Sequence, residues 1–199
     1  GSGVLVDGTN NTVRGCTITD TAGSGIVASG RGHLLTRNRL STIDYSGTYA
    51  APIVLSGESH QITFNTVRDT GRDVLRPGAP GSTVMYNDLS GCGLLCRDLG
   101  VIYIWGANAQ TAGGTRTRVA YNWIHDGNPA DPLSKGVYLD NGTRNFQVDH
   151  NVIWNFGPPG ARTTGIRLNS PADGHELHHN TLYDCLTYNQ DTYSNFPET

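Results

Sequence analysis

Aromatic, acidic and cationic side chains recur at matching places in three short apolar segments of the second half of the chain. The segments are Val-Ile-Tyr-Ile-Trp-Gly (101–106), Gly-Val-Tyr-Leu-Asp-Asn (136–141) and Gly-Ile-Arg-Leu-Asn-Ser (165–170). Their third and fifth positions hold Tyr103, Trp105, Tyr138, Asp140, Arg167 and Asn169. Aromatic rings stack on the apolar faces of sugars, while carboxylates, amides and guanidinium groups bind hydroxyl or acidic substituents. The set therefore predicts a carbohydrate-binding surface.

Asp140 is the strongest candidate for catalysis among these residues, because it ends its segment beside the aromatic and amide groups of the neighbouring segments. Hydrolysis of a glycosidic bond needs two carboxyl groups roughly 5–9.5 Å apart, one to protonate the leaving oxygen and one to act as base or nucleophile. Asp98 precedes the first segment and is the expected partner, provided that the chain bends near Gly100. The reserve candidates are Asp126 and Asp73.

Three other uses of these residues stay open. A lyase that cleaves uronate-containing glycans by β-elimination needs a cation and a base, and Arg167 could serve there. A non-catalytic glycan-binding or structural protein would keep the aromatic rings and Arg167 without a proton donor. In the third alternative the residues have no binding role, because tyrosine pairs stabilise exposed sheets and Asp140-Asn141-Gly142 is a common turn sequence.

Histidines offer a possible metal site, which we do not favour. Its ligands would come from Asp149, His175, His178 and His179, but these are ordinary exposed positions of expected strands. No phosphate-binding loop, Gly-x-Ser-x-Gly motif or His-Glu-x-x-His motif is present. We therefore expect no metal and no other cofactor.

A repeat that runs through the whole chain must position the candidate residues. Seven segments share the pattern apolar-x-x-Asn-x-apolar at intervals of 22–35 residues. The asparagine position is held by Cys16, Asn38, Asn65, Asn87, Asn122, Asn151 and Asn180. In a stacked structure the amide of one repeat can hydrogen-bond the amide of the next, about 4.8 Å away. We therefore expect a ladder of buried asparagines.

Each repeat also contains a short segment with apolar residues at its second and fourth positions. Their second positions are Val4, Ile26, Ile53, Val74, Ile102, Val137 and Ile166, and their fourth positions are Val6, Ala28, Leu55, Arg76, Ile104, Leu139 and Leu168. A period of two predicts strands with one buried face, and Arg76 is the exception to it. Such strands at long intervals, without a helical pattern between them, predict a solenoid. The longer stretches 107–117, 125–135 and 155–164 are expected to wall a groove around the candidate residues.

These Gly-Ile-x-Leu-x-x and x-Asn-x-Ile units resemble those of the pectin-lyase-like proteins, and the resemblance covers residues 3–185. It implies an all-β fold, a right-handed single-stranded parallel β-helix of about seven coils over residues 1–185, followed by a polar tail or cap over 186–199. Many proteins of that group act on polysaccharides. The resemblance therefore implies a secreted or cell-surface glycoside hydrolase that degrades poly- or oligosaccharides. The motifs of pectate lyases and polygalacturonases are missing, so it transfers no catalytic residue.

Composition narrows the expected partners to a carbohydrate. The 199 residues carry a net charge of −3, which argues against a nucleic-acid-binding surface. No run approaches the 18 or so apolar residues of a membrane span, and residues 1–3 lack the basic and apolar pattern of a secretory leader. Because the first coil begins at Gly3 without a capping element, we expect a flanking domain or a partner to cover it.

The cysteine spacing predicts no metal site. We expect free buried thiols, since cysteine packs as a small hydrophobic residue, with a Cys92–Cys96 bridge as the alternative. The cysteines are Cys16, Cys92, Cys96 and Cys185.

Overall fold

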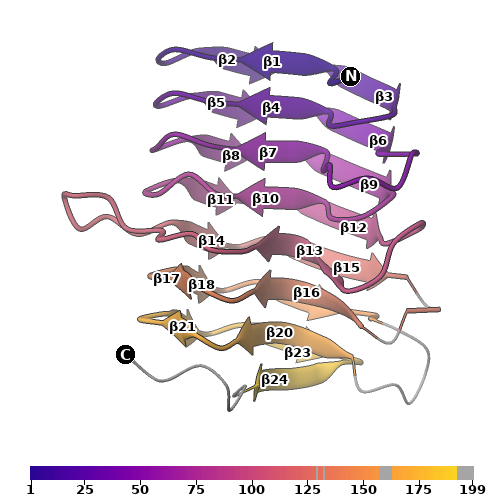
Figure 1. Ribbon diagram of the computed structural model, residues 1–199, viewed down its shortest axis with the longest axis vertical. Coiled ribbons are helices and arrows are strands. Elements are labelled where there is room, and N and C mark those ends of the chain that lie inside the picture. Colours follow the sequence, from indigo (N-terminus) through magenta and orange to yellow (C-terminus); the bar gives the residue numbers. More distant parts are fainter. Residues whose placement is uncertain (129, 132, 157–162, 192–199) are drawn as a thin grey trace.

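Short parallel strands stack into a solenoid in the computed structural model (Figure 1). The structure describes residues 1–128, 130–131, 133–156 and 163–191. All pairs of named strands in this part of the chain are parallel, and each strand pairs with the corresponding strand of the next coil. The same residues include no helix long and apolar enough to cross a membrane.

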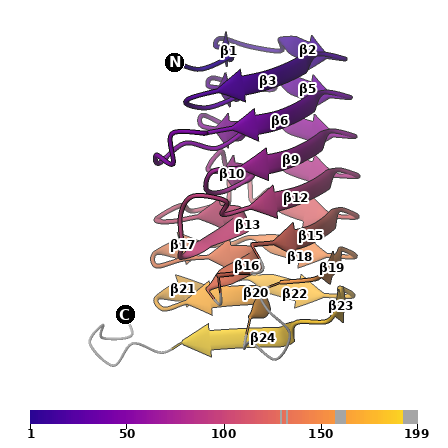
Figure 2. The same ribbon diagram turned by 90° about the vertical axis from the view of Figure 1, so that its right-hand side faces the viewer.

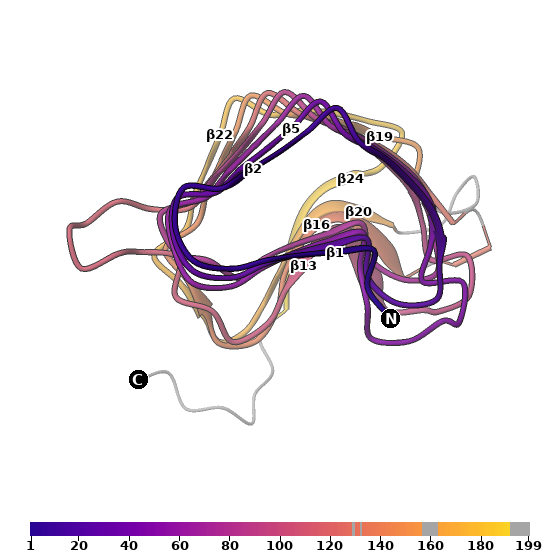
Figure 3. The same ribbon diagram turned by 90° about the horizontal axis from the view of Figure 1, so that it is seen from above.

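Three sheets form the walls of the solenoid, as the view along its axis shows (Figure 3). The first sheet contains β1 (Val4–Val6), β4 (Ile26–Ala28), β7 (Ile53–Leu55), β10 (Leu75–Pro77), β13 (Leu99–Ile104), β16 (Ser134–Leu139), β20 (Thr164–Asn169) and β24 (Leu186–Asp191). The second contains β2 (Thr12–Arg14), β5 (Leu34–Thr36), β8 (Gln61–Thr63), β11 (Thr83–Met85), β14 (Arg118–Ala120), β18 (Gln147–Asp149) and β22 (Glu176–His178). The third contains β3 (Thr17–Thr21), β6 (Arg39–Ile43), β9 (Thr66–Thr70), β12 (Asp88–Cys92), β15 (Trp123–Gly127), β19 (Val152–Trp154) and β23 (Thr181–Tyr183). A small fourth sheet pairs β17 (Thr143–Arg144) with β21 (Ala172–Asp173).

The asparagine ladder forms as the repeat predicts. Asn38, Asn65, Asn87, Asn122 and Asn151 each donate from Nδ2 to Oδ1 of the next member at 2.9–3.0 Å. Asn180, the last member, donates to the Val148 carbonyl instead. Each Oδ1 also accepts the backbone N–H of the preceding ladder position. The residue before each asparagine has a φ between +54° and +60°, so the chain turns sharply there between the second and third sheets. The amides therefore satisfy the backbone groups that this turn removes from the sheets.

The apolar columns of the first sheet fill the interior of the solenoid, and the parallel β-helix prediction is confirmed. One register prediction is wrong. Leu75, not Val74, pairs with Ile53 and Ile102, so Arg76 stands beside outward-facing Val54 instead of in the core. The prediction aligned the segments on the glycine that follows each strand. In coil four one residue fewer separates the strand from this glycine, so the alignment shifted the strand by one position. A guanidinium in the core would cost several kcal/mol, which favours the shifted register.

The last part of the chain continues the stack. β24 lies parallel to β20 at the end of the stack (Figure 2), so strand pairing extends into the segment 186–199 that the sequence suggested as tail or cap. Residues 192–199 lie outside the described part of the chain. All four cysteines are free, as expected, and Cys92 and Cys96 form no bridge. The expectation that they are buried holds for Cys92 alone, because Cys16, Cys96 and Cys185 are partly exposed.

Candidate functional site

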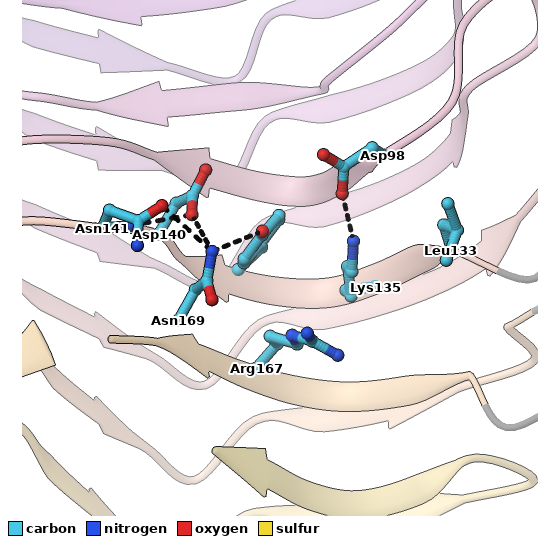
Figure 4. A pocket seen from close by; sticks show the side chains of 8 residues that line it. Asp98, Leu133, Lys135, Asp140, Asn141, Arg167 and Asn169 are labelled. Carbon is cyan, nitrogen blue, oxygen red and sulfur yellow. Dashed lines mark hydrogen bonds and ion pairs between the residues drawn. The ribbon is translucent and has the colours of Figure 1, made fainter. Parts of the chain in front are cut away.

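A cavity of about 470 Å³ opens on the outer face of the first sheet, where coils five, six and seven meet. β16 and β20 supply lining residues, and Asp98 enters from just before β13. The register of the three strands aligns Tyr103, Tyr138 and Arg167 as direct vertical neighbours. Figure 4 shows the side chains that line the cavity: Asp98, Leu133, Lys135, Tyr138, Asp140, Asn141, Arg167 and Asn169. The two aspartates that the sequence suggested as a catalytic pair therefore line the same cavity.

Asp140 lies just after β16 and is nearly buried. Its carboxylate accepts three hydrogen bonds, from Tyr103 Oη at 2.9 Å, Asn169 Nδ2 at 2.6 Å and the backbone N–H of Asn141 at 2.8 Å. Asn169 Nδ2 also lies 3.3 Å from Tyr138 Oη (Figure 4). Three donors aimed at one carboxyl group suit its anionic form and hold it in one orientation.

Asp98 precedes β13 with a φ of +54° and reaches the cavity from the coil next to Asp140. In β13 the fully buried Val101 and Ile102 follow each other, so strict alternation breaks close to Gly100, where the sequence required a bend. Asp98 accepts a hydrogen bond of 2.7 Å from Lys135 Nζ. The side chain of Asp98 is 62% exposed, whereas that of Lys135 is 5% exposed.

Lys135 lies at the start of β16, with Nζ 4.1 Å from the centre of the Tyr138 ring. Burial lowers the pKa of this ammonium group, although the Asp98 carboxylate acts in the opposite direction. Burial also raises the pKa of the Tyr138 hydroxyl, and the negative charge of Asp140 raises it further. The cavity thus combines two carboxylates with two cationic side chains, Lys135 and Arg167.

The aromatic side chains of the predicted surface lie in different environments. Tyr103 and Tyr138 pack edge to face with ring centres 5.4 Å apart, and they are 5% and 4% exposed. Trp105 is 64% exposed and lies outside the cavity lining, as does Tyr103. Tyr103 therefore contacts Asp140 from below the surface, while Trp105 offers an exposed ring directly after the end of β13.

The two reserve carboxylates lie outside this cavity. Asp73 is fully buried and pairs with Arg76 Nη2 at 2.5 Å. Asp126 belongs to β15 in the third sheet and bonds to His125 and Asn155. Of the longer stretches expected to wall the groove, 125–135 supplies Leu133 and Lys135, whereas 107–117 supplies no lining residue. Residues 157–162 of the third stretch lie outside the described part of the chain.

The sequence did not single out Lys135, Leu133 or Asn141 as site residues. Lys135 is the only lysine in the chain, and it immediately precedes the segment that was aligned from Gly136. The strand in fact begins one residue before Lys135, at Ser134, and the register pairs Lys135 with Gly100. An alignment extended by three residues towards the N-terminus would have placed Asp98 opposite Leu133, two residues before Lys135.

The comparison with protein-family models settles the fold family. The model for the right-handed β-helix region matches residues 2–182, which is most of the chain. The chain belongs to the right-handed β-helix family. This membership fits the pectin-lyase-like proteins and confirms the handedness expected from the repeats. The β-helix matches no curated protein and no solved structure in the other two comparisons.

Proposed function

We propose that this β-helix is a glycoside hydrolase that cleaves poly- or oligosaccharides at the cavity between coils five and seven. The observation that carries the proposal is that Asp98 and Asp140 line one open cavity, together with two cations. The β-helix fold is common among carbohydrate-active enzymes, which makes a glycan the natural ligand class, although fold alone establishes no activity.

Asp140 fits the role of base or nucleophile. Its three hydrogen-bond donors stabilise the anion and hold it still, which both roles require. In the inverting case, Asp140 takes a proton from water as the water oxygen attacks the anomeric carbon. In the retaining case, Asp140 Oδ attacks that carbon, and water later hydrolyses the glycosyl-enzyme.

The proton for the leaving oxygen comes from the opposite side of the cavity, where the Lys135 ammonium group donates to Asp98. Asp98 passes a proton to the leaving oxygen and takes one from Lys135 Nζ, whose pKa burial lowers, so Lys135 ends the step neutral. Asp98 is the more exposed of the two, so a glycan oxygen can approach it from solvent. The bond between the anomeric carbon and the leaving oxygen breaks as this proton is transferred.

The remaining side chains suit binding of the sugar chain. Arg167 and Lys135 provide positive charge for an acidic substituent, and the Asn169 and Asn141 amides can bond hydroxyl groups. The exposed Trp105 ring can stack on a sugar in the next subsite. This combination favours a glycan that carries carboxylate groups.

The test is hydrolysis of a panel of acidic and neutral polysaccharides by the unaltered chain and by Asp140→Asn and Asp98→Asn. We expect each variant to lose at least about 100-fold in kcat while still binding the glycan. Asp126→Asn is the matched control, since this aspartate lies outside the cavity, and it should keep full activity. Full activity of Asp140→Asn, or no turnover of any glycan by the unaltered chain, would contradict the proposal; binding without turnover would indicate a glycan-binding module.

One observation favours a lyase as the second candidate. Lys135 is buried with a lowered pKa and shares the cavity with Arg167. In β-elimination Arg167 would bind the uronate carboxylate, and Lys135 would take the proton from the neighbouring carbon. The bond to the leaving oxygen would then break as a carbon–carbon double bond forms. The unsaturated product absorbs ultraviolet light, so its appearance would favour the lyase and its absence the hydrolase.

A further inference from the structure

A histidine cluster lies on the opposite side of the solenoid, at the turns that follow β18 and β22. His150, His178 and His179 each offer a ring nitrogen, and these atoms all lie within 4.8 Å of one another. All three residues are exposed. We propose that this cluster binds a divalent transition-metal ion of the zinc or nickel class, through three imidazole ligands.

The cluster differs from the metal site that the sequence suggested. His175 lies apart from it, where its Nδ1 accepts the backbone N–H of Phe146 at 3.1 Å. Asp149 forms a bidentate pair with Arg118, at 2.8 and 2.5 Å. His150 joins the group instead, because the turn at the ladder asparagine places it directly above His179.

Asp149 is placed to orient His150 as a ligand. Asp149 Oδ2 lies 2.8 Å from His150 Nδ1, and since a carboxylate can only accept, the hydrogen is on Nδ1. This leaves the lone pair of Nε2 for a metal, as in the carboxylate–histidine–metal arrangements of many proteins.

Ring stacking fixes the His150 plane as well. His150 stacks on Tyr121 with ring centres 4.9 Å apart and on His179 at 5.0 Å. Phe64 and Tyr86 continue this stack into the earlier coils at 5.3 Å spacings. Because each inner ring is covered on both faces by its neighbours, the stack presents ring edges, and in its last two members the edges carry nitrogen atoms. The cost of ordering His150 is therefore largely met before the ion arrives.

His178 completes the set. Its Nδ1 lies 2.8 Å from His179 Nδ1, a contact that requires a hydrogen on one of the two nitrogens. A metal ion bound by imidazoles at about 2.0–2.1 Å holds neighbouring nitrogens roughly 3–3.5 Å apart, so small rotations of these exposed side chains suffice. The histidine that carries this hydrogen takes the other tautomer, with the hydrogen on Nε2, so that Nδ1 is free for the ion, and water completes the coordination.

Binding would join two successive coils near the C-terminal end. His150 belongs to the turn after β18, and His178 and His179 to the end of β22 and the turn after it. An ion that binds only the folded state stabilises it by mass action. At a free metal concentration of 100 times Kd, we expect Tm to rise by about 5–10 °C.

The experiment is calorimetric titration of the full chain, free of any affinity tag, with ZnCl₂ and separately with NiCl₂. We expect one ion per chain. His150→Phe and His179→Phe keep an aromatic ring where earlier coils have Phe64 and Tyr86 at the same positive φ, and they remove only the nitrogen ligands. Each should weaken binding at least about 100-fold and abolish the rise in Tm, because loss of a ligand exceeds the 10–100-fold cost of losing a supporting partner.

The control is His125→Phe, which removes a histidine that bonds to Asp88 and Asp126 outside the cluster. It should bind zinc as the unaltered chain does. A second measurement needs no variant: bound zinc should protect His150, His178 and His179 from diethyl pyrocarbonate, as read by mass spectrometry. Failure of the unaltered chain to bind either ion, or unchanged binding by His150→Phe and His179→Phe, would overturn the proposal. Neither result bears on glycan cleavage.

Discussion

Tyr103 donates a hydrogen bond of 2.9 Å to Asp140, from the strand of the preceding coil. Tyr49 Oη lies 3.2 Å from Tyr103 Oη, and since the Tyr103 hydrogen points to Asp140, Tyr49 is the donor in that contact. Burial, followed by the bond to Tyr49, raises the pKa of Tyr103, so the hydroxyl stays protonated. Two hydroxyl groups in series thus hold the candidate catalytic carboxylate.

Tyr103→Phe should lower kcat of the proposed hydrolase by about 10- to 100-fold, the cost of one hydrogen bond to a charged group. The loss should appear in kcat rather than KM, because Tyr103 does not line the cavity. Steady-state kinetics on the glycan found in the panel is the measurement. Tyr49→Phe is the control for a more distant hydroxyl group, and its kcat should fall by less than about 10-fold. An unchanged kcat in Tyr103→Phe would show that Tyr103 does not position Asp140.

Lys135→Met should stabilise the fold while it impairs activity. Burial disfavours the charged ammonium group of Lys135 in the folded chain and so lowers its pKa. The unfolded chain therefore binds this proton more tightly than the folded chain does. With more protons on the unfolded state, stability rises as pH increases through the interval from the folded pKa to the ordinary value near 10.5. An apolar side chain removes this cost, and we expect a gain of about 1–2 kcal/mol at neutral pH.

Thermal unfolding at pH 7 and at pH 10 measures this effect of Lys135→Met. Tm should exceed that of the unaltered chain by roughly 2–6 °C at pH 7, and the difference should shrink at pH 10. Asp98 loses a partner in the variant, but it is exposed enough to be solvated by water. A lower Tm at pH 7 would show that the ion pair stabilises the fold.

Asn122→Ala should destabilise the solenoid by about 3–5 kcal/mol, since it leaves several buried groups without partners. Asn122 Oδ1 accepts the Asn87 N–H and Nδ2 at 3.0 Å, and its Nδ2 donates to Asn151 Oδ1 and the Val84 carbonyl at 2.9 Å. Urea denaturation followed by circular dichroism is the measurement. A loss below about 1 kcal/mol would mean that water replaces the amide.

Cys16→Asn tests the same asparagine ladder, but here we expect the substitution to stabilise the fold. Cys16 occupies the first ladder position, and its N–H already donates to Asn38 Oδ1 at 3.0 Å. An asparagine adds a second donor to that oxygen, and we expect a gain of about 0.5–1 kcal/mol in the same denaturation experiment. A loss of stability would show that the position does not accept an amide.

His175 makes the stability of the last coils depend on pH. Burial lowers its pKa to about 4, from an ordinary value near 6.5. Between pH 4 and pH 6.5 the unfolded chain binds more protons at His175 than the folded chain does. The stability that neutral His175 contributes is therefore complete above about pH 6.5 and is lost as pH falls towards 4. Allowing for partial exposure, we expect a loss of about 2 kcal/mol across this window.

His175→Ser isolates this contribution, because Ser82 already accepts a backbone N–H, that of His60, at the equivalent turn of an earlier coil. The difference in unfolding free energy between the unaltered chain and the variant should decrease from pH 7 to pH 4. A difference that stays constant with pH would exclude His175 as the titrating group.

The sequence predicted the fold because its signals repeat. Six asparagines and two apolar columns must each satisfy the same local geometry, so one misaligned coil does not hide the pattern. Coil four was misaligned because Gly78 follows its strand one residue early, and a single glycine is a weak marker of register.

The candidate site was harder to predict because its residues follow no repeat. Tyr103, Tyr138 and Arg167 could be aligned from the strand columns, and the structure places them in that register. Lys135 belongs to a strand that extends beyond the repeat unit, and its contact with Asp98 depends on a positive φ that the sequence pattern does not encode. Long-range side-chain contacts of this kind require the three-dimensional path of the chain.

The most direct test of the proposed hydrolase is a crystal structure of the Asp140→Asn variant soaked with an oligosaccharide from the panel. We expect a sugar in the cavity, with its glycosidic oxygen within hydrogen-bond distance of the Asp98 carboxyl group and its anomeric carbon facing position 140. A sugar bound on another face of the solenoid, or one in the cavity whose glycosidic oxygen lies far from Asp98, would contradict the assignment of these two carboxylates as the catalytic pair.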